Sequence, residues 1–130
     1  MIKETYCSKE VSILLKEKGF DIPVNYEYHY KITIPQFHRK KHNFNGIEYR
    51  NCSSEWYSAP THQMAMAWLR EVHKIFIEIG ISIDLNGNYH YDYTIVDDKC
   101  RYVIREHTEF EWKFEDAVEA ALKYTLENLI

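Results

Sequence analysis

The sequence predicts an α+β protein in which a mostly antiparallel sheet carries its helices on one face. Two features of the chain predict this class. Residues 61–74 repeat apolar side chains at helical spacing, whereas residues 75–83 place an isoleucine at every second position. Along the whole chain, such segments follow one another in the order α-β-β-α-β-β-β-α.

The first predicted helix covers residues 8–19. The hydroxyl of Ser8 is expected to cap its N-terminus, and Gly19 is expected to end it in the left-handed conformation. A strand is expected next over residues 26–34, where tyrosine and isoleucine alternate with polar residues. Pro35 is expected to end that strand because proline lacks the amide hydrogen that a ladder needs.

Residues 36–46 are expected to form a polar, basic loop. A loop of this length is either functional or mobile. Residues 47–50 could form a short return strand at best, and residues 51–57 read as an irregular lead-in to the second helix.

The second helix and the strand after it form the predicted centre of the fold. Thr61 is the expected N-cap, and Pro60 separates the helix from the chain before it. The apolar stripe of the helix comprises Met64, Ala65, Trp68, Leu69 and Val72. We expect the isoleucines at odd positions from 75 to 83 to face the helices, because each apolar face needs a cover.

The Asn-Gly turn within residues 85–88 predicts a hairpin. A three-residue loop with Gly87 in the left-handed conformation is favoured over a two-residue loop, because it gives the hairpin one apolar face. In that register Ile83, Ile81, Ile79 and Ile77 stand opposite Tyr89, Tyr91, Tyr93 and Ile95. A turn at residues 96–99 and a third strand at residues 100–106 should follow.

The last predicted helix runs from about Lys113 to near the end of the chain. Its packing face comprises Phe114, Ala117, Val118, Ala121, Leu122, Thr125 and Leu129.

Composition sets the broad class. At 130 residues the chain is expected to form a single domain, residues 1–130. A net charge of −4 gives no general attraction to nucleic acid or to an anionic membrane. The chain has no apolar run long enough to span a membrane and no signal-peptide core, so we expect it in the cytoplasm. Its three cysteines are expected to be free thiols.

Three stretches of the chain resemble a known family. They are residues 7–21, residues 57–79 with their Tyr-Ser-Ala-Pro-Thr and Ala-Trp-Leu-Arg-Glu segments, and residues 115–130. The family comprises small uncharacterised proteins of Bacteroidetes genomes, their phages and mobile elements. The chain resembles it in the spacing of these motifs. The resemblance implies an intracellular setting, but it does not indicate any particular activity. The chain departs from the family at Lys113, where a threonine is usual, and residues 37–44 lie outside the shared motifs.

The sequence contains no assembled catalytic or metal-binding motif, so we expect no catalytic residue, no metal and no cofactor. His38 and His42 have a spacing of four residues, but they lie in the predicted loop. Cys7 begins the first predicted helix, where the helix dipole would favour a thiolate, although a small packed residue is the ordinary case there. A carboxylate–histidine cluster on the outer sheet face is chemically conceivable, although charged residues on a wet face are expected without any chemistry. Its members would be Glu78, His90, Asp92 and Glu106.

Two sites are left as candidates. The first is a nucleic-acid contact in the basic loop, formed by Phe37, His38, Arg39, Lys40, Lys41, His42 and Phe44. The second is a protein contact formed by the large aromatic residues Trp56, Tyr57, Phe110 and Trp112.

We therefore predict a non-enzymatic accessory protein of a phage or mobile element that associates with another protein or with itself. The expected surface is the uncovered sheet face or an edge strand. The alternatives are a nucleic-acid-binding module that uses residues 37–44, and a binder of a small ligand in a pocket lined by tyrosines and His90.

Overall fold

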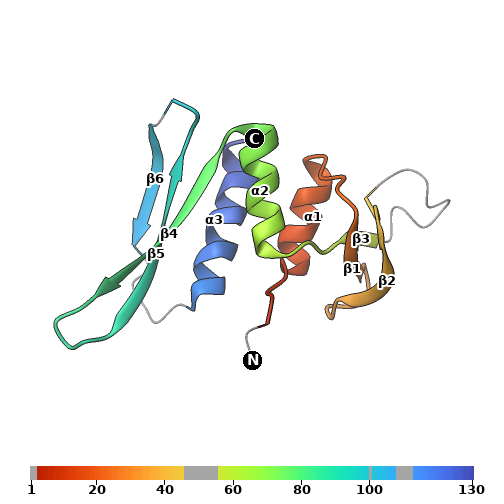
Figure 1. Ribbon diagram of the computed structural model, residues 1–130, viewed down its shortest axis with the longest axis horizontal. Helices are drawn as coiled ribbons and strands as arrows, with labels where there is room; N and C mark the ends of the chain where they lie inside the picture. The colour runs from red at the N-terminus through yellow and green to blue at the C-terminus, as the bar shows by residue number, and fades with distance from the viewer. Residues whose placement is uncertain (1–2, 46–55, 100, 108–112) are drawn as a thin grey trace. The chain divides into compact units, whose positions relative to one another are not determined.

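The computed structural model describes residues 3–45, 56–99, 101–107 and 113–130, and for residues 102–107 it describes the backbone alone (Figure 1). The chain forms two compact units, residues 1–64 and residues 65–130, which are described separately below. We call them the N-terminal unit and the C-terminal unit. That the two make a single domain stays a prediction.

The fold is α+β with antiparallel sheets, which confirms the predicted class. The described elements are α1 (Lys9–Glu17), β1 (Val24–His29), β2 (Gln36–His42), β3 (Trp56–Ser58), α2 (His62–His73), β4 (Phe76–Ile83), β5 (Tyr89–Val96), β6 (Tyr102–His107) and α3 (Phe114–Asn128). None of the described helices is long and apolar enough to cross a membrane.

In the N-terminal unit, α1 lies against a three-stranded sheet of order β2-β1-β3. Ser8 caps α1 as predicted, because its hydroxyl oxygen accepts a hydrogen bond of 3.2 Å from the amide of Val11. Gly19 follows the helix with φ of +88°, which is the left-handed conformation expected there. Val11 and Leu15 form the buried stripe of α1.

The expected basic loop over residues 36–46 was wrong, because residues 36–42 form strand β2. The preceding strand is also shorter than expected: β1 ends at His29, and Ile32 and Ile34 are exposed in the turn that follows. The alternating pattern continues through this turn, so the pattern alone could not mark the strand end. Pro35 was expected to end a strand but instead lies just before β2, which is an edge strand. At that position the missing amide hydrogen of proline removes no hydrogen bond from the ladder.

The remaining expectations for the first half are resolved in part. The short return strand at residues 47–50 lies outside the described residues. Trp56 and Tyr57, expected at the end of an irregular lead-in, form strand β3 together with Ser58, and this strand pairs with β1. The cap of α2 is as predicted, since Thr61 Oγ1 accepts a hydrogen bond of 3.1 Å from the amide of Met64.

In the C-terminal unit, a sheet of order β4-β5-β6 packs on α3. The predicted hairpin register is confirmed, with Ile83 opposite Tyr89 and Ile79 opposite Tyr93. Gly87 has φ of +81°, as the three-residue loop requires. The carboxylate of Asp84 holds the turn, because it accepts hydrogen bonds from the amides of Asn86 at 2.8 Å and Asn88 at 2.9 Å.

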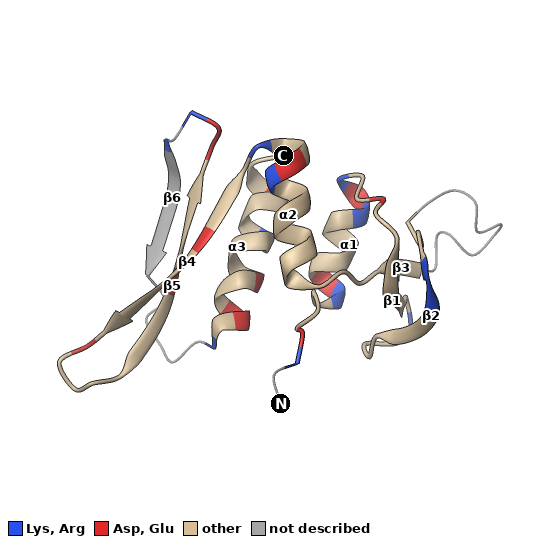
Figure 2. Ribbon diagram, viewed as in Figure 1, with Lys and Arg blue, Asp and Glu red and all other residues tan. Residues whose placement is uncertain are grey.

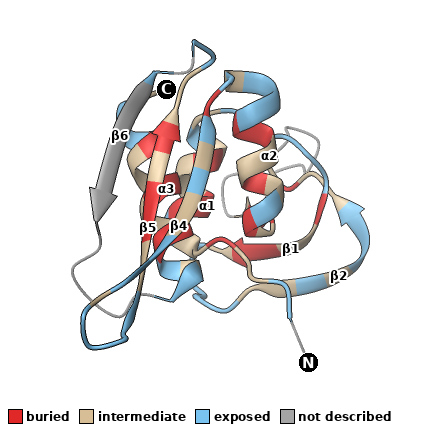
Figure 3. Ribbon diagram, turned by 60° about the vertical axis from the view of Figure 1, so that its left-hand side comes forward, coloured by how far each residue is buried: buried red, intermediate tan, exposed pale blue. Residues whose placement is uncertain are grey.

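The core of this unit comprises Ile75, Tyr93, Ile95 and Ala121, and Ile77 and Ile79 are partly buried against it. The expectation that all odd isoleucines from 75 to 83 face the helices was wrong for the last two. Ile81 is 61% exposed and Ile83 is 62% exposed, and Figure 3 shows exposed residues over the far end of the hairpin. The other partly buried side chains against this core come from α3 and the residues after it, namely Ala120, Tyr124, Leu129 and Ile130.

Helix α3 begins at Phe114, and the amide of Lys113 donates a hydrogen bond of 3.1 Å to Asp116 Oδ2. This reciprocal bond supplies part of a capping box, although Lys113 has no side-chain hydroxyl to accept from the helix. Phe114 was expected on the packing face but is exposed, whereas Leu126 belongs to that face. The buried residues of α3 are Ala117, Val118, Ala121, Leu122, Thr125 and Leu126.

Candidate functional site

Strand β2 carries the predicted nucleic-acid residues along one edge of the N-terminal sheet. Arg39, Lys40 and Lys41 are all exposed, and Figure 2 shows their positive charge running along the strand. Phe37 is 60% exposed beside them. The four residues form what we call the basic edge, whereas Phe44 is buried and does not belong to it.

A bulge in β2 brings its two histidines together. Val24 stands opposite His42, and Tyr26 stands opposite Phe37. The segment of β2 between its two paired residues is therefore longer than the matching segment of β1, which defines a bulge in β2. As a result the ring centroids of His38 and His42 lie 5.9 Å apart. Both rings also contact Phe44, at centroid distances of 4.9 Å and 5.5 Å.

Glu27 lies on β1 next to this histidine pair. It is only 3% exposed, and its carboxylate contacts His38 Nε2 in an ion pair. Burial raises the pKa of Glu27 above its usual value, although the contact with His38 and the nearby His42 and His29 oppose this effect. The exposed basic edge, and not the buried Glu27, is the part of this sheet that a large ligand could reach.

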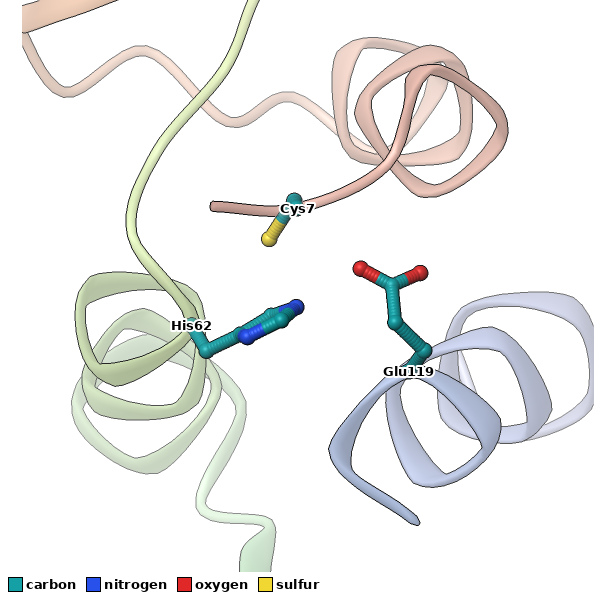
Figure 4. Close-up of side chains that lie close together, drawn as sticks. All are labelled: Cys7, His62 and Glu119. Carbon is teal, nitrogen blue, oxygen red and sulfur yellow. The ribbon is translucent and has the colours of Figure 1, made fainter. Parts of the chain in front are cut away.

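Cys7 and His62 of the N-terminal unit lie side by side, and both are buried (Figure 4). The sulfur and a ring nitrogen lie within 4.8 Å of each other, and His62 Nδ1 is 2.7 Å from Thr5 Oγ1. The amide of Cys7 donates to the carbonyl of Pro60 at 2.9 Å. Cys7 is fully buried, so its thiol cannot reach a substrate, and the group instead ties the N-terminal segment to the start of α2.

Two of the four predicted protein-contact residues are packed within the N-terminal unit. The ring of Trp56 lies 4.6 Å from that of His29, and Lys16 Nζ lies 5.0 Å from the ring centroid of Tyr57. Both aromatic residues are half-buried on β3. Phe110 and Trp112 lie outside the described residues.

The carboxylate–histidine cluster considered from the sequence lies on the outer face of the C-terminal sheet and is described only in part. His90 Nε2 lies 3.1 Å from Asp84 Oδ2, in the turn, and Asp92 lies over Gly80, with Ser82 Oγ donating to its Oδ2 at 3.4 Å. Glu106 stands opposite Tyr93 in the ladder, one row away from Asp92, and its side chain is outside the described part.

A shallow hollow on this outer face bears on the ligand-binding alternative. It is lined by Glu78, Ile79, Gly80, Ile81, Ser82, Asp92 and Thr94. The tyrosines and His90 expected for a ligand pocket are absent from this lining. The hollow therefore gives the ligand-binding alternative no support.

The apolar surface that sequence reasoning missed lies on the inner face of the β4–β5 hairpin. We call it the apolar hairpin face. Ile81 stands opposite Tyr91 and Ile83 opposite Tyr89, while the ring of Tyr91 contacts Phe114 at a centroid distance of 6.0 Å. Ile81, Ile83, Tyr89 and Phe114 are all exposed. The sequence could not reveal this surface, because the same alternation of isoleucine and other residues continues through the half of β4 that is covered, at Ile77 and Ile79.

No protein family, curated protein or solved structure matches this chain. The similarity of three stretches to small proteins of Bacteroidetes and their mobile elements stays a prediction. The fold and the surfaces described above define a small α+β protein with an exposed apolar hairpin and a basic edge strand.

Proposed function

We propose that this protein works by protein–protein association, without catalysis, and that the apolar hairpin face binds a second copy of the chain. The observation that carries this proposal is the exposure of Ile81 and Ile83 on the same sheet face that is covered at Ile77 and Ile79. Single exposed apolar residues are common on protein surfaces. A contiguous apolar group is different and marks an interaction surface.

Charge on the hairpin supports a second copy as the occupant. Lys74 is the only lysine or arginine between residues 72 and 98, and it lies at the foot of β4. Asp84 lies at the tip, and Glu78 lies between them. Residues 74–84 have a positive charge at their start and a negative charge at their end, so this segment is complementary to itself when two copies run antiparallel, although Asp97 and Asp98 lie at the same end of the hairpin as Lys74.

The proposed setting is the cytoplasm of a bacterium, where the protein would be an accessory factor of a phage or mobile element. The resemblance of residues 7–21, 57–79 and 115–130 to the Bacteroidetes family supports this setting. Sequencing the genes around this one in its genome is the direct check: housekeeping neighbours on both sides would contradict the mobile-element setting.

The association is tested by sedimentation velocity across a range of concentrations. We expect the native protein to dimerise, and we expect the double variant Ile81→Ser, Ile83→Ser to weaken the dimer by at least about 30-fold, because each buried isoleucine contributes about 1.5–3 kcal/mol. Val72→Ser is the matched control, since Val72 is exposed on α2 and outside the apolar hairpin face. A native protein that stays monomeric at about 100 µM would sink the proposal.

A second candidate function is the binding of a nucleic-acid backbone by the basic edge. Three consecutive exposed cations next to an exposed phenylalanine can contact phosphates and stack one base. The distribution of charge favours this location, since residues 1–64 contain nine Lys and Arg against seven Asp and Glu, and residues 65–130 contain seven against thirteen.

The nucleic-acid candidate is tested with single-stranded DNA and RNA at several salt concentrations. If the three cations each meet a phosphate, the logarithm of affinity should fall with the logarithm of salt with a slope of about −2. Replacing Arg39, Lys40 and Lys41 by alanine should abolish both affinity and slope, whereas Lys99→Ala, an exposed lysine elsewhere, should change little. The absence of salt-dependent affinity in the native protein would rule this candidate out.

A further inference from the structure

We infer that a single-stranded nucleic acid bound along the basic edge inserts one of its bases into a hollow beside Lys41, and that this hollow selects guanine. This inference rests on the second candidate function above and specifies which strands it prefers. Three features of the N-terminal unit carry it: the hollow itself, a row of aromatic rings that leads to it, and the charges in its lining.

The hollow lies where the N-terminal segment runs beside β1, and we call it the N-terminal hollow. Tyr6 forms an antiparallel bridge with Thr61, which holds this segment in position. The hollow has a volume of about 150 Å³, and its lining includes Glu4, Tyr6, Val24, Asn25, Lys41 and Ala59. Pockets for drug-sized ligands have volumes of about 300–1,000 Å³, so this smaller hollow suits a single ring system.

A row of aromatic rings connects the N-terminal hollow to the start of β2. The ring centroids of Tyr6 and Tyr26 lie 4.3 Å apart, and those of Tyr26 and Phe37 lie 5.1 Å apart. Tyr6 lines the hollow, and Phe37 is exposed at the outer end of the row. Aromatic rings beside a cationic strand are the combination by which proteins hold single-stranded nucleic acid.

The basic edge ends at the same hollow. Arg39, Lys40 and Lys41 are consecutive and exposed, and they follow Phe37 along β2. Of these three cations, only Lys41 lines the N-terminal hollow. A strand whose phosphates follow the cations therefore reaches the hollow at Lys41. The bases of a duplex are paired and stacked, so only a single strand can turn a base into the hollow.

The charges in the lining indicate which part of the strand enters. Glu4 is exposed and acidic, and it repels a phosphate from the hollow. Lys41 attracts the phosphate at the rim and disfavours a cationic ligand inside. A neutral ring that can donate hydrogen bonds to a carboxylate satisfies both conditions, and a nucleobase is such a ring.

The carboxylate of Glu4 also determines the preferred base, because a carboxylate accepts hydrogen bonds and cannot donate them. The Watson–Crick edge of guanine presents two adjacent N–H donors, which the two carboxylate oxygens can accept together. Cytosine and adenine present one amino group each. Thymine and uracil present carbonyl oxygens on both sides of a single N–H, and the carboxylate repels these oxygens. Guanine should therefore bind most tightly, and thymine or uracil least tightly.

The inference is tested by fluorescence anisotropy with short thymidine oligonucleotides that carry either one central guanine or thymine alone. We expect the native protein to bind the guanine-containing strand at least about 5-fold more tightly, which is the lower end of discrimination by a bidentate base contact. We expect the same preference in uridine RNA, because the assigned contacts involve phosphate and base and not the sugar.

Glu4→Gln is the variant that tests the hollow. Its amide has one oxygen and also donates, so the bidentate contact with guanine is lost and a carbonyl oxygen is no longer repelled. The preference for guanine should disappear, whereas affinity for the thymidine strand should not fall. Glu17→Gln is the matched control, since it removes the same charge from an exposed residue at the end of α1 and should keep the preference.

The other outcomes separate the inference from the candidate function on which it rests. Equal, salt-dependent binding of both strands would overturn the inference and leave the basic edge as a contact to phosphates alone. A preference for guanine that survives Glu4→Gln, or that is confined to one of the two sugars, would also overturn it. A native protein that binds neither strand would remove the inference and the nucleic-acid candidate together.

Discussion

The carboxyl group of Asp92 lies directly over the backbone of Gly80, on the neighbouring strand of the same hairpin. A Cβ atom at Gly80 would lie 2.3 Å from Asp92 Oδ1, far inside van der Waals contact. Asp92 is only 8% exposed, so its side chain has little room to move away. The φ of Gly80 is not positive, so its backbone conformation does not require glycine. The glycine is needed because a side chain would occupy the space of the buried carboxyl group.

Gly80→Ala should therefore destabilise the C-terminal unit by about 1–3 kcal/mol, the usual cost of overpacking. Urea unfolding monitored by circular dichroism measures this cost. In an Asp92→Ala background the same substitution should cost less than about 0.5 kcal/mol, because the clashing group is gone and the two effects are not additive. An equal cost in both backgrounds would show that the contact with Asp92 is not the cause.

The buried Glu27 predicts a dependence of stability on pH. Its pKa is raised by burial, so the folded state holds the proton to a higher pH than the unfolded state does. The free energy of unfolding should then fall as pH rises from the ordinary carboxyl range through the raised pKa, and this contribution should be constant on either side. Glu27→Gln should abolish this fall, because the amide does not titrate and can still bond to His38.

The measurement is the free energy of unfolding from pH 3 to pH 8 for the native protein and the Glu27→Gln variant. Glu17→Gln serves as control, since Glu17 is exposed at the end of α1. If the difference between native protein and Glu27→Gln is the same at every pH, the raised pKa is disproved.

The turn of the β4–β5 hairpin should weaken in acid. The pKa of Asp84 is lowered, first by the amide of Asn88 and then by His90 and the amide of Asn86. A lowered pKa gives stability that is present above the ordinary carboxyl value and is lost as pH falls through the folded value. The protection of the Asn86 and Asn88 amides, which is the intrinsic exchange rate at each pH divided by the observed rate, should therefore fall at low pH.

Two substitutions at Asp84 separate charge from hydrogen bonding in this turn. Asp84→Asn keeps an oxygen that can accept from the two amides, so it should retain most of the protection and lose its dependence on pH. Asp84→Ala should remove the protection at all pH values. Exchange rates in Asp84→Ala that match the native protein would contradict the role assigned to the carboxylate.

Truncating a buried isoleucine and truncating an exposed one should change the free energy of unfolding by very different amounts. Ile95→Ala removes a fully buried side chain from the core of the C-terminal unit and should cost about 2–5 kcal/mol. Ile34→Ala truncates an exposed side chain in the turn after β1 and should change stability by less than about 0.5 kcal/mol. Thermal unfolding of both variants checks the contrast, and similar losses would place Ile34 in a packed environment.

The sequence by itself determined the features that depend on neighbouring residues. The caps at Ser8 and Thr61 are correct because each hydroxyl bonds an amide three residues along the chain. The register of the β4–β5 hairpin is correct because Gly87 and the alternating isoleucines leave one arrangement with a single apolar face. These interactions are complete within a few residues, so local sequence contains the information that specifies them.

Tertiary structure alone decided the rest. Residues 36–42 are charged and lack a strand pattern, yet they form β2 because β1 offers an unpaired ladder edge. Glu27 and His38 meet only through that pairing. Ile77 and Ile83 occupy equivalent positions in the alternating pattern, but only the first lies under α3. Whether an apolar residue on β4 is buried depends on which part of the strand α3 covers. That coverage is set by packing between segments far apart in the sequence, which the local pattern does not describe.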